Sequence, residues 1–405
     1  MPLPTIYNND KITINTVSAP CGAGKTYALC KYIKQHQNNK NHLIILPSLV
    51  LMQQYRQELK AAGVQMHMVT DISHKTVVKG AVTSSITTYF KSCMDAGHVL
   101  LITWQAYSFL SYFEHKDNWV IFIDELPQVD SMLTVNISHN KQLVTDFFDV
   151  SYTVNSDICT VAVKDGSRHS LQQAHDSNDD GYKSFKALYS AVLSDNKDVF
   201  VNSKQWATVT DKHTAKSAAN SLDFIVMLHP NQFRNVTLLA ANIEQSILYK
   251  WFERFHKVTF TPHKAITDNL RYIKHSKETS MRIDVHYFFD DIYYSKNLRD
   301  KFIGDNEIVG KKMDDLASDV LADTDFLYVV NKNYDFSSQS NAFNLPVKAH
   351  GLNDYKNFTA IYFNLALNIC MSFRFFLTVS VTGWSNKNTW QAKFSFWQKR
   401  DVATP

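Results

Sequence analysis

The chain has 405 residues, which is enough for two or three domains of about 100–200 residues each. Its composition, 45% hydrophobic and 20% charged, is ordinary for a soluble globular protein with a sizeable core. The net charge of +4 is compatible with nucleic-acid binding but not diagnostic of it. The five cysteines are scattered and form no Cys-x-x-Cys pair, so we expect reduced thiols and no structural zinc. They are Cys21, Cys30, Cys93, Cys159 and Cys370.

No basic segment followed by an apolar one opens the chain, so we expect no signal peptide and a cytoplasmic location. The most apolar stretch, Ile369 to Val381, is interrupted by Ser372, Arg374 and Ser380. It is too short to cross a bilayer, which needs about 20 apolar residues. We therefore expect no membrane segment and no membrane partner.

A glycine-containing loop near the N-terminus reads as a phosphate-binding loop. The alternating segment 11–17 before it predicts a strand, and the apolar spacing from Ala28 to Ile33 after it predicts a helix. Strand, loop and helix are the context that this motif requires. The loop consists of Ala19, Pro20, Cys21, Gly22, Ala23, Gly24, Lys25 and Thr26, with Ala19 in place of the first glycine of the strictest pattern.

The chemistry of this loop is anion binding. Gly22 and Gly24 let the backbone approach a phosphate because neither has a Cβ atom. The helix that begins near Lys25 offers unpaired N–H groups and the positive end of its dipole. Lys25 can reach the β- and γ-phosphates, and the Thr26 hydroxyl can bind Mg²⁺. Cys21 is expected to be a small filler rather than a nucleophile.

The next hundred residues alternate between apolar strands and helices. His42–Leu46 is fully apolar after its first residue, as a buried parallel strand requires, and Ser48 is placed to cap a helix whose apolar face ends before Gly63. That face carries Leu51, Met52, Tyr55 and Leu59. Further elements are expected as strands over Val64–Val69 and Val99–Thr103 and as helices over Ser84–Met94 and Gln105–Phe113.

A second anchor follows the apolar run Trp119–Ile123, which ends in Asp124-Glu125-Leu126-Pro127. Ligands of open α/β sheets collect where the strands end, so two carboxylates there predict a second part of the nucleotide site. We expect Asp124 to hold Mg²⁺ and Glu125 to orient or deprotonate the attacking water. Taken alone, the pair could equally be two solvated acids. The preceding phosphate loop and the four strand-like segments between them favour the site.

The alternation of strands and helices predicts a doubly wound parallel sheet. The order of its motifs resembles the first motor domain of superfamily 2 helicases, the DEAD/DEAH-like group. Ala19–Thr26 matches motif I, and Asp124-Glu125 matches motif II, although Leu-Pro follows where that group has Ala-Asp or x-His. Segments around Pro47 and Ser48, and around Thr103 and Gln105, resemble motifs that touch the backbone of one nucleic-acid strand in that family.

The resemblance implies an α/β P-loop NTPase with two RecA-like parallel-sheet domains and an inserted α+β subdomain. We assign residues 1–145 to the first domain, 146–234 to the insertion, 235–255 to a return strand and link, and 256–405 to the second domain. Within the insertion, segment 167–180 is rich in His and Asp but lacks metal-ligand spacing, so we expect an exposed loop.

Two later segments resemble further helicase motifs. The strand Val236–Ala240 is similar to the start of motif III, with Asn242 where a threonine is usual, although an ordinary core strand is the alternative. The segment 350–355 resembles motif V and the His-Gly-x-Asn segment of viral and phage helicase-like proteins, which matches Gly351 and Asn353. Such a viral or phage type would place the protein in the host cytoplasm.

The C-terminal end departs from the family. Motif VI should bring a glutamine and closely spaced arginines, including an arginine finger, but no arginine follows Gln391 within a turn. Arg374 and Arg400 are the nearby candidates, and the second domain is expected to be divergent or incomplete at its end.

The resemblance implies ATP and Mg²⁺ as cofactors and an ATP-dependent helicase or translocase as the function. Its partner would be DNA or RNA, held through the backbone of a single strand, with room for a protein partner. A DNA-packaging, terminase-like ATPase is one alternative, and it would call for a nuclease domain with clustered carboxylates. A nucleotide-dependent nucleic-acid-binding protein with weak turnover is the other, favoured by the absent arginine finger.

Overall fold

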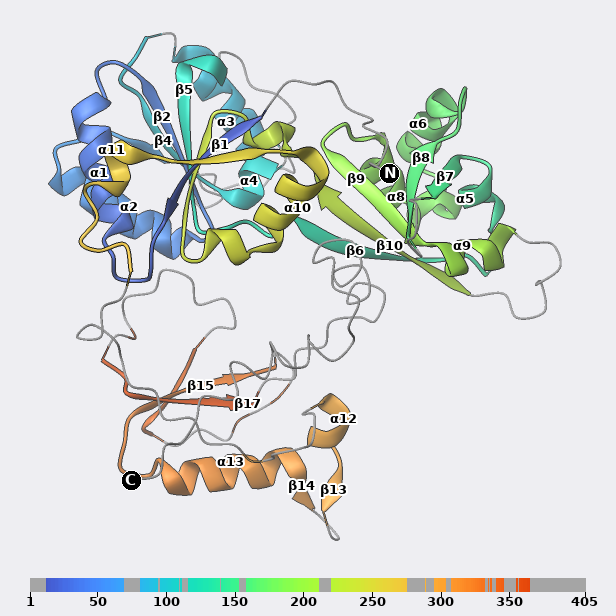
Figure 1. Ribbon diagram of the computed structural model, residues 1–405. Helices are drawn as coiled ribbons and strands as arrows, with labels where there is room; N and C mark the ends of the chain where they lie inside the picture. Colours follow the sequence, from blue (N-terminus) through green and yellow to red (C-terminus); the bar gives the residue numbers. More distant parts are fainter. Residues whose placement is uncertain are drawn as a thin grey trace.

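The computed structural model describes most of the N-terminal two thirds of the chain and separate parts of the rest. The described residues are 12–68, 81–93, 95–108, 110, 116–138, 140–152, 158–210, 220–274, 288, 295–303, 307–331, 334, 336, 340–345, 355 and 357–364. They form a large parallel sheet, an antiparallel sheet inserted into it, and a smaller C-terminal group of elements (Figure 1). No helix among these residues is long and apolar enough to cross a membrane.

The large sheet has seven parallel strands in the order β12-β1-β11-β5-β2-β4-β3. Neighbours that are far apart in sequence require long crossover connections, and parallel strands are linked in this way by helices. This confirms the α/β fold with a large parallel sheet. The strands are β1 (Thr13–Ser18), β2 (Asn41–Leu46), β3 (His67–Met68), β4 (Val99–Thr103), β5 (Trp119–Asp124), β11 (Val236–Ala240) and β12 (Thr259–Pro262).

Helices cover both faces of this sheet, because successive side chains of each buried strand point to opposite sides. In β2, Leu43 and Ile45 join one core cluster, whereas Ile44 and Leu46 join the other. One face carries α1 (Lys25–His36), α2 (Leu49–Ala61) and α11 (Lys264–Thr267). The other carries α3 (Ala81–Ser92), α4 (Trp104–Ser108) and α10 (Ile247–His256), as Figure 1 shows. Short 3-10 turns span Lys116–Asn118, Pro230–Phe233 and Ile243–Gln245.

The inserted unit is a five-stranded sheet of antiparallel pairs in the order β6-β10-β9-β8-β7. Its helices and the sheet enclose a separate core cluster. The strands are β6 (Asp130–Asn136), β7 (Phe148–Tyr152), β8 (Ile158–Val163), β9 (Lys197–Asn202) and β10 (Ser221–Leu228). The helices are α5 (Gln142–Thr145), α6 (Arg168–Asp176), α7 (Asp180–Lys183), α8 (Lys186–Leu193) and α9 (Ser203–Thr210).

Two features of this unit differ from the sequence-based expectation. The sheet begins at Asp130, before the expected boundary at residue 146, because β6 pairs along its whole length with β10. The polar segment 167–180, expected to be a loop, contains α6. Leu171 and Ala174, three residues apart, bury one face of that helix, and polar side chains occupy the remaining faces.

The inserted sheet packs against the large sheet's own core. Ile225 and Met227 of β10 belong to the cluster that contains Trp251 of α10. The Trp251 indole N–H donates to the Leu228 carbonyl at 3.3 Å. His256 Nε2 lies 3.1 Å from Asp198 Oδ2, with both side chains buried. These contacts hold the insertion on the face of the sheet that α10 covers.

The large sheet also extends further along the chain than expected. β12 pairs with β1 from Thr13 to Thr16, so residues beyond 256 still belong to the first sheet. The C-terminal group contains a three-stranded parallel sheet in the order β16-β15-β17. Its elements are α12 (Lys296–Arg299), β13 (Phe302–Ile303), β14 (Glu307–Ile308), α13 (Val309–Val320), β15 (Phe326–Val330), β16 (Ala342–Asn344) and β17 (Ala360–Asn364).

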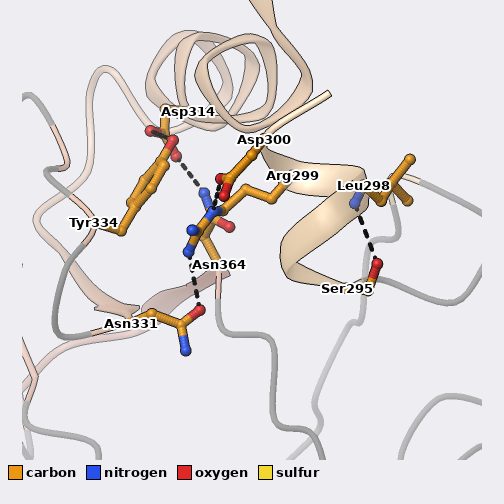
Figure 2. A network of polar contacts seen from close by, with 8 residues as sticks. All are labelled: Ser295, Leu298, Arg299, Asp300, Asp314, Asn331, Tyr334 and Asn364. Atoms are coloured by element: carbon orange, nitrogen blue, oxygen red, sulfur yellow. Dashed lines mark hydrogen bonds and ion pairs between the residues drawn. The ribbon is translucent and has the colours of Figure 1, made fainter. Parts of the chain in front are cut away.

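A buried polar network ties the C-terminal elements together (Figure 2). The Asp314 carboxylate of α13 accepts hydrogen bonds from the Tyr334 hydroxyl at 2.5 Å and the Asn364 amide at 2.8 Å, and also from Tyr362 at 2.7 Å. Arg299 stacks over the Tyr334 ring, with its Cζ atom 4.6 Å from the ring centroid. Because a buried carboxylate is costly unless its oxygens are hydrogen-bonded, this network indicates one specific arrangement of α13 on the strand ends.

Candidate nucleotide-binding site

The predicted phosphate loop lies between β1 and α1. Gly22 and Gly24 have φ angles of 79° and 84°, in the left-handed region that glycine adopts without steric cost. The Ala23 N–H donates to the Pro20 carbonyl at 3.3 Å, and α1 begins directly at Lys25. The loop therefore turns tightly onto a helix N-terminus, which is the backbone form of an anion site.

Lys25 directs its charge into this loop. Its side chain is buried, and its ammonium group donates to the carbonyl oxygens of Ala19 at 2.9 Å and Pro20 at 3.1 Å. A buried ammonium with neutral acceptors is well placed to exchange them for phosphate oxygens, because opposite charges attract strongly away from water.

The loop and the acidic pair Asp124-Glu125 are joined through β11, the strand between β1 and β5. The Ala19 N–H donates to the Ala240 carbonyl at 3.0 Å, and the Glu125 N–H donates to the Leu239 carbonyl at 2.8 Å. Two strand spacings separate the ends of β1 and β5, which is about 10 Å. That separation is bridged readily by a phosphate group and a metal ion, so the structure brings the two predicted motifs to one edge.

Asp124 is buried at the end of β5. The Tyr55 hydroxyl of α2 donates to its Oδ2 atom at 2.6 Å, and the Thr26 side chain lies close enough to lower the pKa of Tyr55, against the larger effect of burial, which raises it. Burial raises the pKa of Asp124 to about 6, against the opposing effects of the Tyr55 hydrogen bond and the Lys25 charge. Thr26, Tyr55 and Asp124 thus form one cluster that contains both predicted Mg²⁺ ligands.

Asp124→Asn is expected to stabilise the protein at pH 7 in the absence of nucleotide and Mg²⁺. The pKa of Asp124 is higher in the folded state than its ordinary 3.8, so the folded protein retains the proton longer and stability falls as pH rises from about 4 to about 6. The shift corresponds to about 3 kcal/mol at pH 7, and the Asn variant avoids this cost while still accepting from Tyr55. Chemical denaturation at pH 4 and pH 7 measures it.

The matched control is Asp117→Asn, on the 3-10 turn before β5. It removes the same negative charge from an exposed position, where no burial cost is relieved. If Asp124→Asn is no more stable than the unmodified chain at pH 7, the buried Asp124 carboxylate does not destabilise the fold.

Glu125 has an unusual backbone conformation. Its φ angle is 67°, which is uncommon for residues other than glycine, and its side chain is half-buried just past the end of β5. Such strain costs about 1–3 kcal/mol and persists only where the surroundings impose it, as the hydrogen bond to Leu239 does here. The Glu125 carboxylate is near enough to Asp124 for its charge to raise the pKa of Asp124.

The residues expected to contact nucleic acid lie on the neighbouring strand ends. Leu46 pairs with Thr103, which places Pro47 and Ser48 beside Thr103 and Gln105. Ser48 Oγ accepts from the Leu51 N–H at 3.2 Å, the expected helix cap, and Thr103 Oγ1 accepts from the Ala106 N–H at 3.2 Å. Both hydroxyls thus shape helix starts, while Pro47 and Gln105 are exposed at the same edge.

Asn242 follows β11 with a φ angle of 53° and precedes the 3-10 turn Ile243–Gln245. Asparagine tolerates this left-handed conformation better than the β-branched threonine that is usual in motif III, which gives a backbone reason for the departure. In the same turn, Glu244 accepts from the Ser18 hydroxyl at 3.0 Å and so connects it to the end of β1. Gly351, Asn353, Arg374 and Arg400 lie outside the described residues.

From the sequence pattern, Tyr55 is predicted only to lie on a buried helix face, and no site role is predicted for Arg271 and Tyr272. Tyr55 carried a weak signal, a hydroxyl on an otherwise apolar face, which needs a partner when buried. Arg271 and Tyr272 contact the phosphate loop from the segment after α11. They lie almost 250 residues from the loop in sequence, and no local pattern marks them.

The residues present fit a nucleotide with Mg²⁺. The loop glycines adopt the left-handed backbone that lets the loop wrap around a phosphate, and the Thr26 hydroxyl and the Asp124 carboxylate are the oxygen donors that Mg²⁺ prefers. Within the described part of the chain, no group of three or more His, Cys, Asp or Glu side chains could hold a metal ion. A Mg²⁺ site of this kind needs only one or two protein ligands, since phosphates and water complete it.

A comparison with protein families agrees with this geometry. Residues 6–153 match the model of the ResIII family, described as the Type III restriction enzyme, res subunit. No curated protein matches the chain. The matched region contains the phosphate loop and Asp124-Glu125, and it covers less than half of the chain. Residues 6–153 are therefore similar to a P-loop NTPase domain of the DEAD/DEAH-like, superfamily 2 helicase-related kind.

Proposed function

We propose that this protein is an ATP-dependent nucleic-acid motor, a helicase or translocase that couples ATP hydrolysis to binding of a single DNA or RNA strand. The observation that carries the proposal is the shared edge of the large sheet. The phosphate loop, the Asp124-Glu125 pair, and the exposed Pro47 and Gln105 follow strands β1, β5, β2 and β4 of that one sheet. A nucleotide site and a strand-binding surface on one rigid sheet can influence each other directly.

In the proposed reaction, Lys25 binds the β- and γ-phosphates of ATP and neutralises charge that develops as the terminal bond breaks. Thr26 and Asp124 would hold Mg²⁺, which supplies further neutralisation of the phosphates. Glu125 accepts a proton from the attacking water, whose oxygen bonds to the γ-phosphorus while ADP leaves with the electrons of the broken bond. Tyr55 positions Asp124 through its 2.6 Å hydrogen bond.

The domain organisation belongs to the same proposal. The three-stranded parallel sheet of the C-terminal group supports a second motor domain, which would start after residue 274 rather than at residue 256. The antiparallel insertion between β5 and β11 is anchored through α10, so it moves with the first domain. Its place on the side of the sheet away from α1 leaves the phosphate loop uncovered by it.

The test is steady-state ATP hydrolysis by the purified chain with and without single-stranded DNA or RNA. We expect stimulation by at least one of them, together with binding that weakens as salt is added, because the contacts are to backbone phosphates. Each phosphate neutralised contributes a slope of roughly −0.7 in a plot of log affinity against log salt. Salt-independent binding, or no binding to any oligonucleotide, would contradict the motor.

The same assay separates the other functions. A nucleotide-dependent binding protein would bind strands without stimulated turnover, and a DNA-packaging ATPase would respond to double-stranded rather than single-stranded DNA.

A further inference from the structure

The segment that follows α11 lies against the phosphate loop. We name residues 268–272 the strap. Its Arg271 N–H donates to the Ala23 carbonyl at 3.0 Å, and the Tyr272 hydroxyl donates to the Cys21 carbonyl at 3.1 Å. At its other end, Asn269 accepts from the Lys31 ammonium of α1 at 2.7 Å. The strap is thus fastened both to the loop and to the helix that the loop begins.

Strap side chains lie against the loop glycines. A Cβ atom on Gly24 would lie 3.5 Å from Cγ, 3.6 Å from Nε and 3.7 Å from Cδ of Arg271. A Cβ atom on Gly22 would lie 2.9 Å from the Tyr272 hydroxyl. The Arg271 side chain therefore passes over the residue immediately before Lys25, at the positively charged start of α1.

The guanidinium of Arg271 differs from that of Arg299. Arg299 is buried and donates to Asp300 at 2.7 Å and to Asn331 at 3.1 Å (Figure 2). Arg271 is exposed, and within the described residues no hydrogen bond or ion pair holds its guanidinium. A guanidinium next to Gly24 meets the positive end of the α1 dipole, which is unfavourable by itself. An anionic ligand in the loop relieves that repulsion.

We propose that Arg271 binds the terminal phosphate of the nucleoside triphosphate in the phosphate loop, as a catalytic residue supplied by the same domain. This inference rests on the proposed function. Arginine suits the task because its planar, permanently charged fork binds phosphate oxygens in pairs. Since the Arg271 backbone is hydrogen-bonded to the loop itself, the contact forms without closure of the C-terminal domain.

The experiment compares Arg271→Ala, Arg271→Lys and the control Lys274→Ala, which removes one exposed positive charge three residues further on. Affinities for fluorescent ATP and ADP analogues, turnover and melting temperature are measured for each. We expect Arg271→Ala to lower turnover by about 10²–10³, the usual effect of losing one donor to developing charge. It should weaken ATP binding more than ADP binding, with the Lys variant intermediate and the control unchanged.

Two results would overturn the role of Arg271. The first is a turnover of Arg271→Ala within twofold of that of the unmodified chain. The other is an equal loss of ATP and ADP affinity with a lower melting temperature, which would make the strap only a brace for the loop. If the unmodified chain binds ATP without hydrolysing it, the proposed motor fails while the ATP-to-ADP affinity ratio still tests Arg271. A chain that binds neither nucleotide overturns both.

Discussion

Lys25→Ala is expected to lower ATP hydrolysis by at least about 10²–10³ while leaving the fold intact. The ammonium group of Lys25 points into the phosphate loop, and among the described residues its hydrogen bonds go to the carbonyl oxygens of Ala19 and Pro20, so phosphate can replace these neutral acceptors. The substitution removes no hydrogen bond to an acidic group, because both acceptors are neutral carbonyl oxygens, and it raises the pKa of Asp124 further. Turnover and thermal melting, measured on the same preparation, test both halves of this expectation.

Lys34→Ala is the matched control for Lys25, since it removes a lysine from the same helix, on its exposed face. Lys25→Arg keeps the charge but changes its reach, and is expected to recover only part of the rate. Normal turnover of Lys25→Ala would show that residues 19–26 are not the phosphate site. A large drop in melting temperature would instead assign the lysine a structural role.

Glu125→Gln is expected to bind ATP with nearly unchanged affinity and to hydrolyse it about 10²–10⁴ times more slowly. The amide has the shape of the carboxylate but cannot accept the proton of the attacking water. Asp124 and Tyr55 keep their 2.6 Å hydrogen bond, so the proposed Mg²⁺ ligand remains in place. Equilibrium binding and single-turnover hydrolysis separate the two steps.

The left-handed backbone of Glu125 makes the choice of substitution important. Gln retains the side-chain length. Gly would also relieve the backbone strain at a φ angle of 67°, so the effects on stability and on catalysis could not be separated. Glu58→Gln, on the exposed side of α2, controls for loss of a negative charge. Single-turnover hydrolysis by Glu125→Gln at the unmodified rate would remove Glu125 as the general base.

The elements that could be predicted from the sequence are those whose patterns are local. Full burial on both faces makes a strand continuously apolar, and this identified the strands at His42–Leu46, Val99–Thr103 and Trp119–Ile123. Helical spacing identified the buried face of α2, whose buried residues are the four predicted ones. The glycines of the phosphate loop were recognisable because a tight turn around an anion restricts which residues can stand there.

Contacts between segments far apart in sequence could not be predicted from local patterns. The insertion begins at Asp130 rather than at residue 146 because β6 pairs with β10, about 90 residues away. The residue pattern of a strand does not show which strand it pairs with. The polar segment 167–180 lacked a visible apolar stripe, yet two buried side chains were enough to hold α6 against α8. Tertiary packing overrides weak local preference in this way.

The residues of the candidate site also fall into those marked by local patterns and those brought in by long-range contacts. Lys25, Thr26, Asp124 and Glu125 were predictable as neighbours at one edge of the sheet, because each follows a strand with a strong pattern and parallel strands end at a common edge; their roles stay a prediction. Tyr55, Arg271 and Tyr272 were not, because their roles come from contacts across 69 residues for Tyr55 and 251 residues for Tyr272. A hydroxyl or guanidinium group can bind many partners, so its partner is known only once the chain has folded. The contact between the strap and the phosphate loop is of this kind.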